Sequence, residues 1–284
     1  QLIILYNHGK FIELIKQTEK LIALYPKAFI VWNINGVANK EVGRLNDALV
    51  AFKKTISLNP NFPEAYINLG TLFKRKGMIE EAMKAYKKAL LLRPNYAEVF
   101  FNIAIIYKAQ DNIEDAIKCY QKALSIKPEY ADAYINLGII FKEQNQSEKA
   151  LEKFKKVLSF NPNNIEAIYN IGLINKENGD FEEAIEKYKK VLSLKPDYAQ
   201  AYNHIGIINA EKGELKNALN MFNKSLEINP DYPDALNNIA NIFMEERKLI
   251  EAIDIFKKVL ALKPDYEITR SRKLHEQAHI CDWE

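Results

Sequence analysis

The sequence predicts an all-α protein in which one pair of helices is repeated in tandem along the chain. Eight of the ten prolines stand at a strict interval of 34 residues: Pro26, Pro60, Pro94, Pro128, Pro162, Pro196, Pro230 and Pro264. An alanine follows the same interval, at Ala48, Ala82, Ala116, Ala150, Ala184, Ala218 and Ala252. Four places after each alanine comes an aromatic residue: Phe52, Tyr86, Tyr120, Phe154, Tyr188, Phe222 and Phe256. A fixed interval without slippage indicates one structural unit that is copied.

The interval divides most of the chain into seven units when each proline takes position 32. The units are 29–62, 63–96, 97–130, 131–164, 165–198, 199–232 and 233–266. Residues 1–28 are predicted to be a degenerate half-unit, because Gly9 and Pro26 fit the pattern while Leu14 and Thr18 replace the alanine and the aromatic residue. Residues 267–284 are predicted to form a capping or linker helix.

The first half of each unit is predicted to be an amphipathic helix, helix A. A large apolar residue at position 4, such as Trp32, and a small residue at position 8, such as Gly36, share one face with positions 7 and 11 at the helical period of about 3.6 residues. A loop is expected after it, where glycine gives the backbone freedom to turn. These glycines are Gly43, Gly77, Gly179 and Gly213.

The second half is predicted to be helix B, with its apolar stripe at positions 17, 20, 24, 27 and 28. Acidic residues such as Glu80 and Glu81 come first and lysines such as Lys87 and Lys88 come later, which is the order that the helix dipole favours. The proline at position 32 is expected to end the helix. Small residues at positions 8 and 20 should let helices A and B approach closely.

Composition excludes several classes of protein. The 40 Lys and Arg against 37 Asp and Glu give a net charge of +3, which argues against a nucleic-acid binder. No run approaches the roughly 18 apolar residues of a membrane span. The two cysteines, Cys119 and Cys281, form neither a disulfide framework nor a zinc pattern, so we expect a reducing, cytoplasmic location. Because the chain begins with Gln1, we expect a fragment or a processed form.

The 34-residue interval and the pattern W/Y-x-x-L-G-x-x-F…A-x-x-x-F/Y…P resemble the tetratricopeptide repeat (TPR) family over nearly the whole chain. The resemblance implies a right-handed superhelical solenoid, in which each unit is stable against its neighbours.

Position 6 of helix A points away from the predicted core stripe, toward a concave groove of the solenoid. It carries Ile34, Asn68, Asn102, Asn136, Asn170, His204 and Asn238. A carboxamide can both donate to and accept from the backbone of an extended peptide, so the sequence predicts peptide binding here. The alternative is that these asparagines bond locally within their own repeat or to water.

Positions 5, 9 and 12 surround the asparagines and complete the predicted site. The apolar members are Ile67, Phe101, Ile105, Ile135, Ile139, Tyr169 and Leu173, and the lysines are Lys74, Lys108, Lys142 and Lys176. Apolar side chains between charged rims are typical of a recognition surface. Neighbouring repeats or a second copy of the chain could instead cover them. Toward the C-terminus Asn203, Asn237 and Asn241 should make the groove polar. At position 11, Asn39, Asn175 and Asn209 interrupt the core and should pack loosely or hold water.

The tail contains His275-Glu276-Gln277-Ala278-His279, an H-E-x-x-H sequence that on a helix would place two histidines toward zinc. We interpret it as accidental, because only five residues follow it, the last of them Glu284. The stretch from Lys273 to Trp283 resembles the junction after the repeats in bacterial relatives of the O-linked N-acetylglucosamine transferase (SPINDLY-like) family. That resemblance implies an asparagine ladder at Asn68, Asn102, Asn136, Asn170 and Asn238 that presents proteins to a catalytic region beyond this chain.

The sequence therefore predicts a non-enzymatic module that binds extended segments of partner proteins, with no cofactor, no metal, no nucleic acid and no membrane. Two alternatives remain open. One is the substrate-recognition arm of a glycosyltransferase, and the other is a scaffold that self-associates through its groove or its open ends.

Overall fold

The structure is a computed structural model that describes residues 1–265, and these contain sixteen α-helices and no strand. The predicted all-α class is confirmed. Contacts divide the chain into two compact units, Gln1–Leu137 and Gly138–Glu284, which are described separately below. The predicted helix over 267–284 and the H-E-x-x-H sequence lie outside the described residues.

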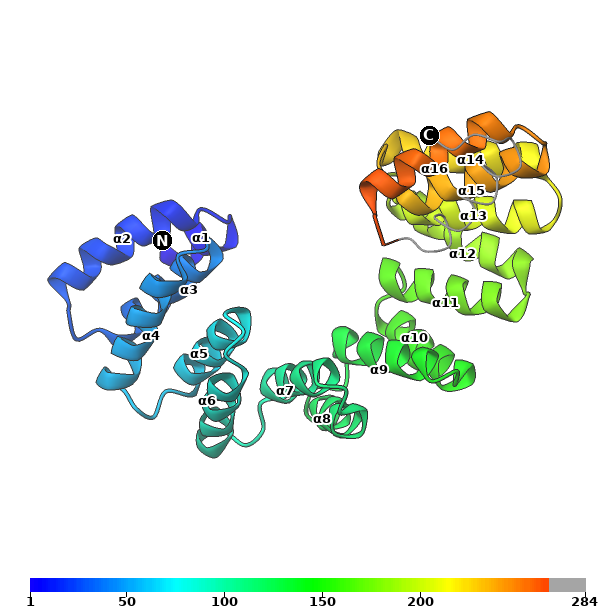
Figure 1. The fold of residues 1–284 in the computed structure, drawn as a ribbon. Helices are drawn as coiled ribbons and strands as arrows, with labels where there is room; N and C mark the ends of the chain where they lie inside the picture. The colour runs from blue at the N-terminus through cyan, green and yellow to red at the C-terminus, as the bar shows by residue number, and fades with distance from the viewer. Residues whose placement is uncertain (266–284) are drawn as a thin grey trace. The chain divides into compact units, whose positions relative to one another are not determined.

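In the first unit, helices follow one another in pairs along the chain (Figure 1). They are α1 (Leu2–Asn7), α2 (Phe11–Leu24), α3 (Phe29–Glu41), α4 (Leu45–Leu58), α5 (Pro63–Arg75), α6 (Ile79–Leu92), α7 (Ala97–Ala109) and α8 (Ile113–Ile126). Helix α9 (Ala131–Glu143) begins in this unit and ends in the next.

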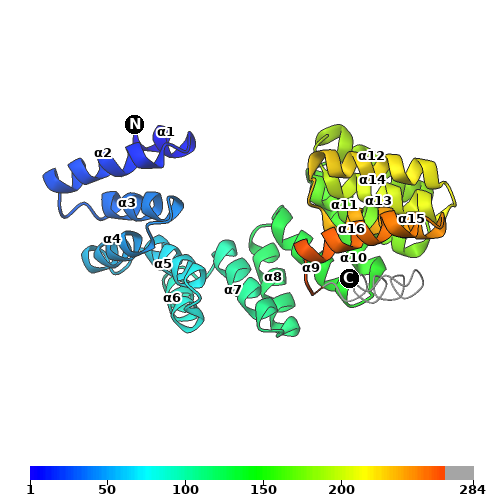
Figure 2. The same cartoon turned by 45° about the horizontal axis from the view of Figure 1, so that its top comes forward.

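The second unit continues the same alternation, which Figure 2 shows from another side. Its helices are α10 (Ser147–Phe160), α11 (Ile165–Asn178), α12 (Phe181–Leu194), α13 (Ala199–Glu211), α14 (Leu215–Ile228), α15 (Pro233–Glu245) and α16 (Leu249–Leu262). From α3 onward, helices with odd numbers correspond to helix A and those with even numbers to helix B.

Close packing within a pair depends on the small residue at position 8. A Cβ atom added to Gly206 on α13 would lie 2.5 Å from Cε1 of the buried Phe222 ring on α14. The same contact would be 2.6 Å between Gly70 and Tyr86. The aromatic residue at position 24 therefore packs directly against the backbone of helix A at position 8, a contact that the predicted approach of positions 8 and 20 did not specify.

The loop inside each pair turns through a left-handed residue. Glycine provides it where it is present, as at Gly43 with φ 82°. In the repeats that lack this glycine the same place is taken by Asp111, Asn145 and Arg247, with φ between 57° and 59°. Asp and Asn tolerate this conformation better than most residues, whereas Arg247 adopts it at a steric cost.

Helix B ends before the periodic proline rather than at it. Helix α4 ends at Leu58, and Asn59 is already extended, with φ −140° and ψ 90°, one residue before Pro60. The ring of a proline disfavours the helical conformation of the residue before it, so the effect on the chain begins one residue early.

The N-terminal half-unit forms α1 and α2 and replaces the usual aromatic contact with hydrogen bonds. Leu14 and Thr18 are fully buried. The Thr18 hydroxyl lies 2.9 Å from the Leu14 carbonyl oxygen and accepts a bond of 2.9 Å from Nδ2 of Asn35 on α3. A buried hydroxyl with these partners is satisfied, so a threonine is accommodated at this core position.

Candidate functional site

The side chains at position 6, here called the ladder, lie on the A helices. Three of them bond to their own helix: Nδ2 of Asn102, Asn136 and Asn170 donates to the carbonyl oxygen four residues earlier, each at 2.8 Å. This bond fixes the plane of each amide. The local hydrogen bond that the sequence left open as an alternative is therefore present, and it uses only part of each amide's capacity.

Two of these amides keep an acceptor. Oδ1 of Asn136 and of Asn170 accepts no hydrogen bond from any residue that the structure describes. Asn136 is half-buried, whereas Asn170 is 8% exposed. An amide oxygen has two lone pairs, so each can receive an N–H group from a bound segment.

Asn102 differs because a lysine already occupies its oxygen. Nζ of Lys74 on α5 donates to Oδ1 of Asn102 on α7 over 2.7 Å. Burial lowers the pKa of Lys74, because removal from water disfavours the charged ammonium. A lysine from the preceding repeat thus sets the hydrogen-bonding state of this ladder step.

Asn68 and Asn238 bond to the preceding repeat instead of to their own helix. Nδ2 of Asn68 donates to Oδ1 of Asn33 at 3.0 Å, and Nδ2 of Asn238 donates to Oδ1 of Asn203 at 3.1 Å. These bonds connect one A helix to the next.

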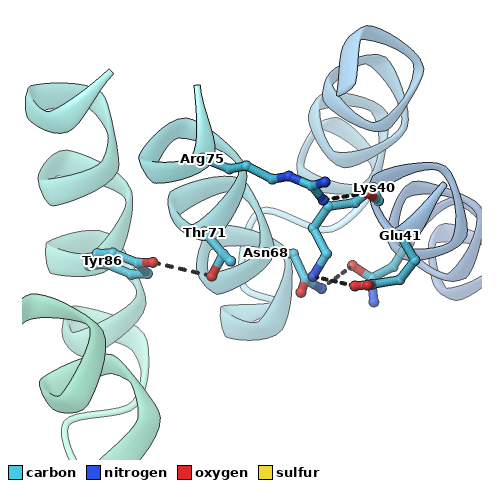
Figure 3. A network of polar contacts seen from close by, with 7 residues as sticks. Lys40, Glu41, Asn68, Thr71, Arg75 and Tyr86 are labelled. Atoms are coloured by element: carbon cyan, nitrogen blue, oxygen red, sulfur yellow. Dashed lines mark hydrogen bonds and ion pairs between the residues drawn. The ribbon is translucent and has the colours of Figure 1, made fainter. Parts of the chain in front are cut away.

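Figure 3 shows Asn68 on α5 within a wider polar network of the first unit. Nearby, the Arg75 guanidinium donates to the Lys40 carbonyl at 2.8 Å, and Lys40 forms an ion pair of 3.1 Å with Glu41. On another side of α5, Thr71 points toward the hydroxyl of Tyr86, 3.2 Å away. Polar contacts within and between the pairs therefore hold α5 on two sides.

His204 is the ladder step on α13, and it belongs to an aromatic cluster. Its Nε2 lies 3.0 Å from the Tyr169 hydroxyl, and its ring stacks on Tyr188 with centroids 5.4 Å apart. Burial, and then the charges of Lys176 and Lys142, lowers the pKa of His204 to about 4. The imidazole is neutral at pH 7 and acts as a hydrogen-bonding aromatic ring rather than as a cation.

One feature of the sequence accounts for these different partners. Where position 5 of the preceding repeat is polar, at Asn33, Tyr169 and Asn203, the ladder residue 35 places later bonds to it. Where that position is apolar, at Ile67, Phe101 and Ile135, the ladder asparagine bonds to its own helix. A polar residue in the preceding repeat thus removes the local bond.

The apolar residues predicted for the groove divide into two sets. Ile67 and Ile135, only 8% and 2% exposed, are core residues, so the prediction of exposed side chains is wrong for these two. Ile67 packs with Val99 and Ile103 of the next A helix. Neighbouring repeats cover position 5 when it carries isoleucine. The remaining predicted residues are half-buried: Phe101, Ile105, Ile139, Tyr169 and Leu173.

The predicted lysines Lys74, Lys108, Lys142 and Lys176 are all half-buried. Lys142 forms an ion pair of 3.4 Å with Glu177 in the second unit. The Lys74 ammonium has a polar partner in Asn102, as Lys142 has in Glu177.

Burial corrects one prediction about asparagines, that of a polar groove toward the C-terminus, and leaves the one at position 11 standing. Asn203 and Asn237 are 2% and 7% exposed, so they belong to the interior and do not make the groove polar. At position 11, Asn39 is buried but does not lack partners, because its Nδ2 donates to Oδ1 of Asn35 at 2.9 Å. Amides from neighbouring turns satisfy each other here.

The sequence analysis missed one recurring contact at the end of several repeats, between position 31 and position 34. The Lys127 ammonium lies 4.6 Å above the Tyr130 ring, and the Lys195 ammonium lies 5.6 Å above the Tyr198 ring. Arg93 makes the same contact with Tyr96 at 4.7 Å. The sequence signal that could have predicted this contact is a basic residue three positions before a tyrosine.

Other chemistry finds little support among the described residues. They contain no group of three or more His, Cys, Asp or Glu side chains placed to hold a metal ion. Burial raises the pKa of the Cys119 thiol, which keeps it protonated and a poor nucleophile. No helix in 1–265 combines the length and apolar character needed to cross a membrane.

The repeats match models of known protein families. The model described as TPR repeat matches residues 38–77, 106–145, 175–213 and 208–246. Three further models, each described as tetratricopeptide repeat, also match. The first covers 63–96 and 131–164, the second covers 85–118 and 153–186, and the third covers 233–266. A search of curated proteins found no match.

Solved structures resemble the chain in fold. A chain of the APC/C heterotetramer Cut9–Hcn1 superposes with a TM-score of 0.69 at 16% identity, over 94% of this chain and 52% of that one, so this chain spans about half its length. YrrB, described as a TPR protein with an unusual peptide-binding site, gives 0.53 at 28% identity, over 66% of this chain and 96% of its own. MamA gives a TM-score of 0.50 at 29% identity, over 58% of this chain and 96% of MamA. The repeats and these relatives support a protein-interaction module.

Proposed function

Because the chain belongs to the tetratricopeptide repeat family, we propose that it binds extended segments of partner proteins along its ladder. The supporting observation is the set of tethered amides. Asn102, Asn136 and Asn170 are held by a bond of 2.8 Å to their own helix, so each presents its remaining atoms in one orientation. A side chain that is already ordered loses little entropy when a ligand arrives.

The spacing of the ladder suits an extended segment. Packed helices lie about 8–10 Å apart, and an extended chain rises about 3.3 Å per residue, so one repeat corresponds to about three residues. In the first unit Oδ1 of Asn136, and in the second unit Oδ1 of Asn170, would each accept an N–H group from the backbone of a segment bound to that unit. Contacts to the backbone position a segment without reading its side chains, so this part of the site should be tolerant of sequence.

A pull-down from cell lysate with identification by mass spectrometry tests the proposal. The test variant carries Asn102→Ala, Asn136→Ala and Asn170→Ala. The control carries the same change at three exposed amides between helices, Asn61, Asn95 and Asn163. Circular dichroism first establishes that both are folded. Loss of many unrelated proteins from the test variant alone is expected, and an unchanged bound set in that variant would contradict the proposal.

A second proposed function is the substrate-recognition arm of a glycosyltransferase related to the O-linked N-acetylglucosamine transferases. The ladder asparagines Asn68, Asn102, Asn136, Asn170 and Asn238 support it, whereas Ile34 and His204 depart from that pattern. The test joins the chain to whatever follows Glu284 in its gene and measures transfer of sugar from a nucleotide sugar to captured protein. Capture without transfer favours the binding module.

Self-association is a third proposal, supported by apolar surface at α1. Leu2, Ile3, Tyr6, Ile34 and Val37 line a cavity of about 260 Å³ together with Asn33, and Ile3 is 72% exposed. Light scattering over a hundredfold range of concentration would show an increasing mass, and Ile3→Lys should abolish the increase. A constant monomer mass excludes it.

A further inference from the structure

We infer that the second unit contains a side-chain pocket beside Asn170, and that it accepts one bulky, uncharged apolar or aromatic side chain of the bound segment. The inference rests on the proposed peptide-binding function and adds a preference for sequence to it. The pocket measures about 420 Å³ and is lined by Ile165, Glu166, Tyr169, Asn170, Lys195 and Tyr198. That volume lies within the range of about 300–1,000 Å³ that is typical of ligand sites.

The walls of the pocket are an aromatic corner. The rings of Tyr169 on α11 and Tyr198 before α13 have centroids 5.2 Å apart and planes inclined at 59°. Ile165, in the first turn of α11, adds an aliphatic wall. Burial raises the pKa of both tyrosines, so both hydroxyls remain protonated at neutral pH. The corner therefore presents neutral aromatic surface rather than charge.

The corner is held in place from behind. The Tyr169 hydroxyl lies 3.0 Å from Nε2 of His204, and the Tyr169 ring also packs against Tyr188 at 5.8 Å. His204 and Tyr188 stack on each other with planes only 16° apart. Two side chains that the pocket does not include therefore fix the orientation of Tyr169. A wall that is ordered before binding lowers the entropic cost of filling the pocket.

The charges around the corner select against a charged guest. The Lys195 ammonium already lies 5.6 Å above the Tyr198 ring, so a second cation would meet like charge at the face that would otherwise attract it. Glu166 lines the same pocket and carries the opposite charge, so the pocket has no net charge that would favour a cationic or an anionic side chain. A neutral apolar or aromatic side chain loses no hydration of a charge on entering and gains from burial against the rings.

The position of the pocket connects it to the ladder. Asn170, whose Nδ2 is bound to the Glu166 carbonyl, is itself a lining residue. A segment whose backbone N–H donates to Oδ1 of Asn170 would place a neighbouring side chain at the corner. Asn170 would then position the backbone, and the corner would choose the side chain.

Selection from a random dodecapeptide library tests the inference. The library is selected against the unmodified chain, against Tyr198→Ala and against Tyr198→Phe. A control is Tyr25→Ala, which removes a tyrosine that is 62% exposed and does not line the pocket. Peptides from the unmodified chain should be enriched in Leu, Met, Phe, Tyr or Trp at one position. Their affinity should decrease about 10- to 100-fold in Tyr198→Ala, while Tyr198→Phe and Tyr25→Ala retain it.

The outcomes separate the two proposals. Enrichment of Lys and Arg, or of Asp and Glu, at that position overturns the pocket inference and leaves groove binding intact. The same conclusion follows if peptides lose no affinity in Tyr198→Ala. If no peptide is selected, or if the selected peptides bind Asn170→Ala and Tyr198→Ala as tightly as they bind the unmodified chain, the groove function fails together with the pocket. If Tyr198→Ala does not fold, the measurement passes to Tyr198→Leu, which keeps an apolar wall but removes the ring, and peptides with an aromatic residue at that position should then bind about tenfold more weakly.

Discussion

The ladders of the two units use the same helix position but different partners. In the first unit the steps are Ile34 and three asparagines, and Lys74 of the preceding repeat holds the oxygen of Asn102. In the second unit the middle step is His204, whose partner is the hydroxyl of Tyr169 in an aromatic cluster. The difference shows that the chemistry of one step depends both on the ladder residue and on the side chain that the preceding repeat places beside it. It also gives each unit its own sensitivity to pH and to mutation.

The largest expected effect concerns acid. The pKa of His204 is lowered to about 4, whereas an unfolded histidine titrates near pH 6.5. The unfolded state therefore binds the proton first, so this contribution to stability is complete above pH 6.5 and is lost as the pH falls toward 4. The loss at pH 4 should be about 2–3 kcal/mol. Thermal unfolding between pH 7 and pH 4 should show a smaller loss for His204→Asn than for the unmodified chain.

The carboxylates of the chain titrate in both proteins, so the difference between the two profiles is the relevant quantity. Asn136→His in the first unit is a matched comparison, because it places a half-buried histidine at the same repeat position without the Tyr169 cluster. Identical acid profiles for the unmodified chain and His204→Asn would show that His204 is not protected from protonation.

A second substitution tests the close packing of α13, the helix that carries His204, against α14. Gly206 lies two residues later on α13, and a Cβ there would come within 2.5 Å of the Phe222 ring. Gly206→Ala should lower the free energy of unfolding by about 1–3 kcal/mol through overpacking, although alanine is the better helix former. Denaturant unfolding measures it. Ala104→Gly is the reciprocal control and should cost about 1–2 kcal/mol, from the lower helix propensity of glycine and from the loss of a buried methyl group. A gain in stability for Gly206→Ala would refute the close contact.

A third prediction separates ladder steps that are available to a ligand from those that connect repeats. Asn136→Ala in the first unit and Asn170→Ala in the second should each weaken binding of an extended peptide to that unit by about 2- to 5-fold, which is about 0.5–1 kcal/mol for the lost hydrogen bond. Asn68→Ala and Asn238→Ala together should instead lower stability by about 1–2 kcal/mol, because Asn33 and Asn203 lose their partners. Calorimetry measures the first quantity and denaturant unfolding the second. Equal effects of both pairs on binding would contradict the distinction.

The smallest expected effect concerns Lys74. Lys74→Met removes the ammonium that occupies Oδ1 of Asn102 and keeps a stem of similar length. The affinity for an uncharged extended peptide should increase by up to about threefold, since one more acceptor becomes available. Lys108→Met is a control at the same position of the next repeat. Weaker binding by Lys74→Met would mean that the ammonium itself contacts the segment.

The sequence determined the repeating fold by itself. Helix periodicity, loop glycines such as Gly43, and the small residues at positions 8 and 20 are short-range or strictly periodic, so the residues predict them without coordinates. It also identified the ladder position on each A helix. The row of lysines and the row of asparagines could be read from the 34-residue interval alone.

Only the tertiary structure decided what each ladder residue bonds to and which apolar residues are accessible. Ile67, Ile135, Phe101 and Tyr169 all occupy position 5 of their repeats and so face the same direction on their helices. Neighbouring A helices nevertheless bury the two isoleucines and leave the two aromatic residues partly exposed. The pocket beside Asn170 depends on Lys195 and Tyr198 from the following loop. Periodicity defines directions around one helix, whereas burial and hydrogen bonding depend on the distance to the next helix, which packing of side chains sets.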